Sequence, residues 1–240
     1  MLDVLYRDDA LVAINKPSGL LVHRSRIDRA ATAFALQAVR DQIGQYVYPV
    51  HRLDKPTSGV LLFGLSPEAA RTLNTAFVER RVQKTYLATV RGHPPEEITI
   101  DRPLKPLRDK TTDANAAPNP EPQPAVTHLR TLATSDRPFA IGKYPTSRYA
   151  LIEARPETGR MHQIRRHCNG IAHPILGDGK HGDYRHNHYL RDHLGIARLL
   201  LHAHRLTLPH YGERLTLTAP LPPDFTDALD HLGLNAVEHR

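Results

Sequence analysis

Short apolar segments, each bounded by turn residues, recur along the chain, and few of them are long enough to form a helix. The run Val60–Phe63 contains four consecutive apolar residues, a length typical of a buried strand. The segments Leu2–Tyr6 and Leu11–Ile14 are separated by a polar turn, which predicts a hairpin. Further strands are expected at 20–22, 86–90, 126–132, 149–154, 199–208 and 215–217. Because hairpin-length connections dominate, we predict an α+β fold with a mixed, largely antiparallel sheet flanked by helices and loops.

Four segments combine helical spacing with start or stop signals. Gly44 can end a helix that carries Leu36, Val39 and Ile43. Ser66, followed by a proline, is a typical N-cap, and Asp224 can cap a last short helix. Gly170 can end a third helix. The expected inner faces are Ala69, Leu73 and Phe77 after Ser66; Met161, Ile164 and Cys168 before Gly170; and Phe225, Leu229 and Leu232 after Asp224.

The chain has 240 residues, which suits one large domain or two small ones. We predict a single domain over residues 1–240, with a Pro-rich loop at about 101–125. Cys168 is the only cysteine, so no disulfide framework is possible, and this favours a reducing compartment such as the cytoplasm. The sequence has no apolar run of about 18 residues, so we expect no contact with a membrane.

The charge balance favours a polyanionic partner. Lys and Arg together number 32 against 25 Asp and Glu, a net charge of +7. Only seven of the cations are Lys, and Arg makes the forked contacts that suit phosphate. RNA or DNA is the simplest partner for such a chain. A solvated, Arg-rich surface with no nucleic acid would have the same composition, so this alternative stays open.

Polar residues crowd the turn His51–Gly59, which lies between two predicted strands. Asp54 has Arg52 and Lys55 as neighbours, and nearby cations favour the ionised carboxylate. An ionised carboxylate on a rigid loop can serve as a nucleophile or a base. The alternative is an Asp that only hydrogen-bonds to the amides of its own turn.

Two more segments carry side chains that could take part in binding or catalysis. On the helix before Gly170, His162, Arg165, Arg166 and Asn169 share a polar face, and an Arg at the core edge could form an ion pair with a carboxylate from another segment. A solvated basic face is the alternative. Tyr86, at the head of a strand, could stack on a base or transfer a proton, or could belong to the core.

The 16 histidines do not form a recognisable metal site. His162 and His167 are five residues apart, and His202 and His204 would share one strand face. Neither pair has a Cys or Glu at the spacing of known zinc motifs. We therefore predict no metal, and the sequence also lacks phosphate-loop and dinucleotide-binding motifs.

Taken in order, the polar motifs resemble those of the RluA family of pseudouridine synthases. The matching segments are Asn15–Gly19, His51–Gly59, Lys84–Tyr86, Gly159–His167, His173–Asp178 and Leu200–Ala203. The resemblance implies the pseudouridine synthase fold and the isomerisation of uridine to pseudouridine in RNA, without cofactor or metal. Many members carry an S4 RNA-binding domain before the catalytic one, and we expect none here.

The resemblance also implies roles for individual residues. Asp54 matches the catalytic aspartate, Arg165 the arginine that pairs with it, and Tyr86 the tyrosine that stacks on the uracil. Arg52 is a candidate to fill the gap left by a flipped base. Further expected contacts with RNA are His51, Lys16, Arg160, His162, Gln163 and Arg166.

The loops suggest the substrate. Segments 123–128, 144–149 and 177–183 are similar to those of family members that modify uridine 65 in the T-stem of tRNA. We therefore expect tRNA as partner, and no obligate protein partner is implied. Alternatives are a synthase that acts on ribosomal RNA, a non-catalytic RNA-binding module of the same fold, and a His-rich metallohydrolase.

Overall fold

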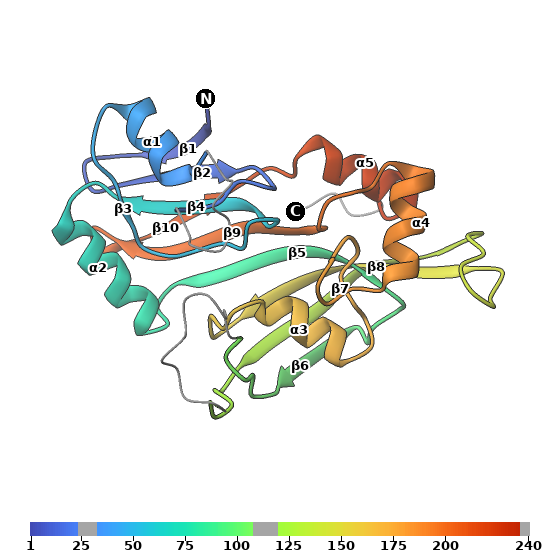
Figure 1. Ribbon diagram of the computed structural model, residues 1–240. Coiled ribbons are helices and arrows are strands. Elements are labelled where there is room, and N and C mark those ends of the chain that lie inside the picture. The colour runs from blue at the N-terminus through green and yellow to red at the C-terminus, as the bar shows by residue number, and fades with distance from the viewer. Residues whose placement is uncertain (24–32, 108–119, 236–240) are drawn as a thin grey trace. The chain divides into compact units, whose positions relative to one another are not determined.

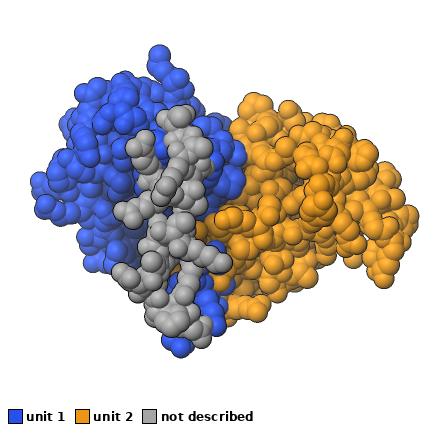
Figure 2. Space-filling view, viewed as in Figure 1, with its two compact units in different colours: residues 1–84, 103–124, 203–220 blue, residues 85–102, 125–202, 221–240 orange. Residues whose placement is uncertain are grey.

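The computed structural model describes residues 1–23, 33–107 and 120–235 (Figure 1). The chain divides into two compact units, coloured separately in Figure 2. Unit 1 comprises residues 1–84, 103–124 and 203–220, and unit 2 comprises residues 85–102, 125–202 and 221–240. The single domain expected from the sequence stays a prediction.

Unit 1 is built on strands near the N-terminus. β1 (Asp3–Arg7) and β2 (Leu11–Lys16) form the predicted antiparallel hairpin, which is confirmed. β2 then pairs antiparallel with β4 (Ser58–Gly64), every residue of which is buried. The remaining antiparallel pairings join β3 (Tyr48–Pro49) to β4, and β10 (Glu213–Thr218) to β9 (Leu201–His210).

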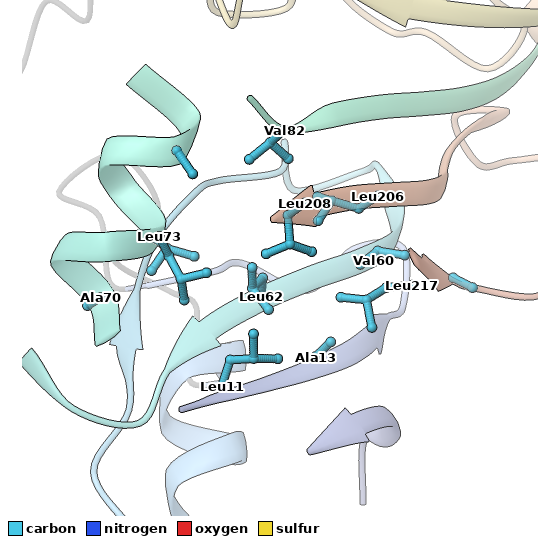
Figure 3. Packing of buried hydrophobic residues seen from close by; sticks show 13 residues of the cluster. Leu11, Ala13, Val60, Leu62, Ala70, Leu73, Val82, Leu206, Leu208 and Leu217 are labelled. Carbon is cyan, nitrogen blue, oxygen red and sulfur yellow. The ribbon is translucent and has the colours of Figure 1, made fainter. Parts of the chain in front are cut away.

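Helix α2 (Pro67–Val78) covers the core of unit 1. Its predicted N-cap is confirmed, because the Ser66 hydroxyl accepts a hydrogen bond from the amide of Ala69 at 3.1 Å. Leu73 enters the core as predicted and lies near Leu62 (Figure 3). The other buried residues of the helix are Ala70 and Ala76, so the predicted face was wrong at Ala69. Phe77 is only partly buried.

Helix α1 (Ala35–Ile43) ends at Gly44 in the left-handed conformation, as predicted. The strand predicted at 20–22 is wrong, since only Leu21 forms a bridge, a parallel one to Phe34. The carbonyls of Leu21 and Val22 instead accept hydrogen bonds from the amides of Ala35 and Leu36, at 2.8 and 3.0 Å. They satisfy the first amide groups of a helix that has no side-chain cap.

Unit 2 contains a run of antiparallel strands in the order β5 (Gln83–Arg91), β8 (Ser147–Pro156), β7 (Val126–Arg137) and β6 (Glu97–Asp101). Alternate residues of β5 and β8 point to opposite faces, and each face has its own core. One face packs against α3 (Gln163–Gly170), which lies over β7 and β8 (Figure 1). The other packs against α4 (Tyr184–Leu194) and α5 (Pro223–Leu232).

Three expectations about helices in unit 2 need correction. Met161 was expected in the core but is 39% exposed, because α3 begins only at Gln163 and the helical periodicity does not reach back to Met161. Helix α4, whose N-cap is Asp183, was not expected from the sequence. Asp224 lies in the first turn of α5 rather than at its N-cap, where Pro222 stands.

The predicted fold class is confirmed as α+β with a mostly antiparallel arrangement. The Pro-rich segment at 101–125 continues from the end of β6, and a bridge joins Leu104 to Gln123. Residues 108–119 of that segment lie outside the described residues. Within the described ranges, no helix is long and apolar enough to span a membrane.

Candidate active site

Residues 51–57, here called the Asp54 loop, connect β3 to β4 in unit 1. The amide of Thr57 donates a hydrogen bond to the Asp54 carbonyl at 3.0 Å, which closes a tight turn. Leu53 and Thr57 are buried, whereas Asp54 between them is only partly buried and Arg52 is exposed. Buried residues on both sides therefore hold the backbone of Asp54 in place, while Asp54 itself is only partly buried.

Lys16, at the end of β2, supports the Asp54 loop through hydrogen bonds to backbone carbonyls. Its side chain is fully buried, and its ammonium donates hydrogen bonds to the carbonyls of Pro17, Leu20 and Lys55 at 2.9, 2.8 and 3.1 Å. The Ser18 hydroxyl adds a hydrogen bond to the carbonyl of Pro56 at 2.7 Å. These bonds tie the turn after β2 to the Asp54 loop. The contact with RNA that we expected of Lys16 would require this loop to open.

Replacing Lys16 with Met is expected to lower the free energy of unfolding by about 2 kcal/mol, because three backbone carbonyls lose the charged donor that the buried Lys16 side chain provides. Pseudouridine formation should fall as well, since the Asp54 loop loses its support. Urea titration and an isomerisation assay would measure the two effects. Lys143→Met, at an exposed position, is the matched control and should change stability by less than about 0.5 kcal/mol. Equal losses in the two variants would contradict the support role.

His51 begins the loop as a hydrogen-bond acceptor. Its Nε2 accepts from the amide of Leu62 at 3.0 Å, and its ring stacks on Phe77 of α2 at 4.9 Å between centroids. Burial and, as the smaller cause, the positive charge of Lys84 together lower the pKa of His51 to about 3. The imidazole is therefore neutral near pH 7, with its proton on Nδ1. The geometry gives His51 a role in anchoring the loop to β4 and α2.

In unit 2, Arg165 of α3 forms a buried, forked ion pair with Asp178. Its Nε and Nη2 donate to the two carboxylate oxygens, each at 2.8 Å, and the side chains are 5% and 0% exposed. Burial alone would raise the pKa of Asp178, but hydrogen bonds from Arg165 and from the amides of His181 and Lys180 outweigh it and lower the pKa. The predicted pairing of a core-edge Arg with a carboxylate from another segment is confirmed.

Gln163 joins the loop before α3 to strand β7. Its amide group donates to the Val126 carbonyl and to the Thr127 hydroxyl, both at 2.9 Å. Its carbonyl oxygen accepts from the Thr158 hydroxyl at 2.6 Å and from the Arg160 amide at 3.0 Å. Gln163 is buried, and these hydrogen bonds give it a support role, whereas its expected contact with RNA stays a prediction.

His162 precedes α3 in the left-handed conformation, with φ of 54°, which is uncommon for a residue other than glycine. It is buried, and its Nδ1 lies 2.9 Å from Nε2 of His181. Arg160 and Arg166 are partly buried on either side of it. Tyr86 is partly buried on β5, opposite Ala154, and packs against the core that includes Ile164.

The predicted site residues thus fall into two groups. Lys16, His51, Arg52 and Asp54 lie together in unit 1, whereas Tyr86 and the residues of the 160–166 segment belong to unit 2. The pairing of Asp54 with Arg165, implied by the family resemblance, stays a prediction. Sequence reasoning missed the role of Asp178, although Asp178 ends one of the matching segments. It also missed His181, although His181 lies within the loop segment 177–183 that suggested the substrate.

Comparison with solved structures identifies the fold. The human protein "RNA Pseudouridylate Synthase Domain Containing 1" superposes with a TM-score of 0.71 and 27% sequence identity, over 99% of this chain and 96% of that chain. "Human RNA Pseudouridylate Synthase Domain Containing 4" gives the same TM-score at 28% identity, over 96% and 93% of the two chains. The predicted pseudouridine synthase fold is confirmed.

Sequence comparisons agree. A family model for RNA pseudouridylate synthase matches residues 10–170. A Yersinia pestis protein named tRNA pseudouridine synthase C is 49% identical over 99% of this chain and 93% of its own length. A Pectobacterium carotovorum protein of the same name is 54% identical over 91% of this chain. The matched region covers 59% of that relative's length. The resemblance to the RluA family is confirmed. The chain therefore belongs to the RNA pseudouridylate synthase family, and it is an isomerase that acts on RNA.

Proposed function

We propose that this protein converts uridine to pseudouridine in tRNA, at uridine 65 of the T-stem. The assignment of tRNA as the substrate rests on one observation. The Yersinia pestis relative, which matches nearly the whole chain, is named a tRNA pseudouridine synthase. The position rests on the loop segments 123–128, 144–149 and 177–183, which are similar to those of members that modify uridine 65. We place the reaction in the cytoplasm, consistent with a chain that has a single cysteine.

In the proposed reaction, Asp54 is the catalytic group. The bond between N1 of uracil and C1′ of ribose breaks, the ring turns, and a bond forms between C5 and C1′, while C5 loses its hydrogen to solvent as a proton and N1 takes up a proton. The Asp54 carboxylate acts either as a nucleophile or as a base that removes a ribose proton. Both routes need a carboxylate held at one place, and the hydrogen bonds of Lys16 to the Asp54 loop support this requirement.

The other residues position the base and the carboxylate. Arg165, held by Asp178, pairs with Asp54 in the substrate complex and orients it. The Tyr86 ring stacks on the flipped uracil, and its hydroxyl is a candidate proton relay at C5. Arg52, exposed next to Asp54, fills the gap that the flipped base leaves in the RNA helix. Arg160 and Arg166 contact the flanking phosphates.

Release of tritium from C5-labelled uridine tests the proposed function, because C5 loses its hydrogen only when pseudouridine forms. The purified protein is incubated without added metal with a labelled tRNA pool and, separately, with labelled ribosomal RNA. We expect release from tRNA, abolished when uridine 65 is replaced by cytidine. Release from ribosomal RNA alone would overturn the substrate. Tight RNA binding without release from either RNA would leave a non-catalytic RNA-binding module.

A further inference from the structure

Arg80, directly after α2, has an unusual backbone conformation. Its φ is 57°, in the left-handed region that residues with a Cβ atom rarely adopt. The amide of Arg81 donates to the Ala76 carbonyl at 2.9 Å, and the amide of Arg80 donates to the Phe77 carbonyl at 3.2 Å. These two bonds form a Schellman motif, in which the left-handed position is usually glycine. The chain carries a long cationic side chain where its backbone would favour glycine.

The surrounding segment holds this conformation in place. Val82, two residues further on, is 5% exposed and lies in the unit 1 core close to Leu208 (Figure 3). The end of α2 and the buried Val82 therefore fix the backbone on both sides of Arg80. The Arg80 side chain itself is exposed, so core packing does not explain why an arginine stands there.

The end of α2 adjoins the Asp54 loop. Phe77, one turn before Arg80, stacks on His51, the first residue of that loop. Lys84 lies close enough to both Arg80 and His51 for its charge to interact with each. The acid at this helix end, Glu79, is bound by Arg81 at 2.6 Å. Arg80 and Lys84 thus bring positive charge close to His51, the first residue of the Asp54 loop.

We propose that Arg80 binds a backbone phosphate of the substrate RNA beside the flipped nucleotide. The inference rests on the proposed function, because it needs an RNA substrate at the Asp54 loop. An arginine suits this position, since its guanidinium makes forked hydrogen bonds to phosphate oxygens. The strained backbone places a guanidinium where glycine would be the easier residue, and strained residues cluster at functional sites.

Arg80→Gly gives a test in which stability and binding move in opposite directions. Removal of the Cβ relieves the strain, so the unfolding midpoint should rise by roughly 2–4 °C. The KM for tRNA should rise roughly tenfold with kcat nearly unchanged, because a charged hydrogen bond is lost. The slope of log affinity against log salt concentration should become shallower by about one. Arg80→Lys should retain most of the salt dependence.

Arg71→Gln is the matched control, since it removes one exposed positive charge from the same helix and should leave both the KM and the salt slope unchanged. If Arg80→Gly lowers stability and leaves the KM and the salt slope as in the wild type, Arg80 serves only the helix end, and the inference is overturned. The wild-type protein reports on the proposed function separately. Absence of tritium release from tRNA by the wild type would reject that function, whereas release together with an unaffected Arg80→Gly variant would reject only the role of Arg80.

Discussion

Asp54→Asn is expected to abolish pseudouridine formation, with a loss of at least about a thousandfold in the rate constant of a single turnover. Asparagine keeps the shape of the side chain but is neither a carboxylate nucleophile nor a base. Because Asp54 is partly exposed and its backbone carbonyl closes the turn, the substitution should leave the fold and the affinity for tRNA unchanged. Tritium release under single-turnover conditions, with a binding assay in parallel, measures both effects.

Asp9→Asn, at an exposed position of the same unit, is the control for the loss of one negative charge and should retain full activity. Activity of Asp54→Asn comparable to that of the wild type would remove Asp54 from the catalytic role. A parallel loss of tRNA binding would instead indicate that the Asp54 loop holds the RNA.

Asp178→Asn is expected to lower the free energy of unfolding by about 3–5 kcal/mol, because a neutral amide replaces the carboxylate that forms the forked ion pair with the buried Arg165 guanidinium. Chemical denaturation measures this loss. Asp192→Asn is the matched control, since Asp192 forms a 2.8 Å pair with Arg191 on the surface, where such pairs contribute less than about 1 kcal/mol. A small effect of Asp178→Asn, similar to that of the control, would show that the buried pair does not stabilise the fold as expected.

The Arg165–Asp178 pair also makes the free energy of unfolding depend on pH in the acid range. The native pKa of Asp178 lies below its ordinary value of 3.8, so the native state favours the ionised carboxylate more than the unfolded state does. This contribution is therefore complete above pH 4 or so and is lost as the pH falls through the native pKa. Denaturation midpoints measured between about pH 6 and pH 3 should fall less steeply in Asp178→Asn than in the wild type. If the midpoints of the two proteins fall equally steeply with pH, other carboxylates dominate the loss of stability in acid.

Local signals in the sequence were sufficient for much of the fold. The Ser66 cap, the Gly44 stop and the hairpin before Lys16 were predicted correctly, because each depends on the conformational preferences of a few neighbouring residues. The segment 20–22 was predicted wrongly for the opposite reason. Its carbonyls accept hydrogen bonds from the first amides of α1, and these donors lie outside the short window from which the strand was predicted.

For the site, the sequence by itself determined the chemistry, since the ordered motifs around Asp54, Tyr86 and Arg165 were sufficient to predict an RNA pseudouridine synthase. Only the tertiary structure decided what supports these groups. It showed Lys16 buried beneath the Asp54 loop and Asp178 as the partner of Arg165. Such pairings join residues from separate segments, and burial makes them strong by excluding water. Neither contact nor burial is encoded in the local spacing of residues, so both depend on how the chain folds back on itself.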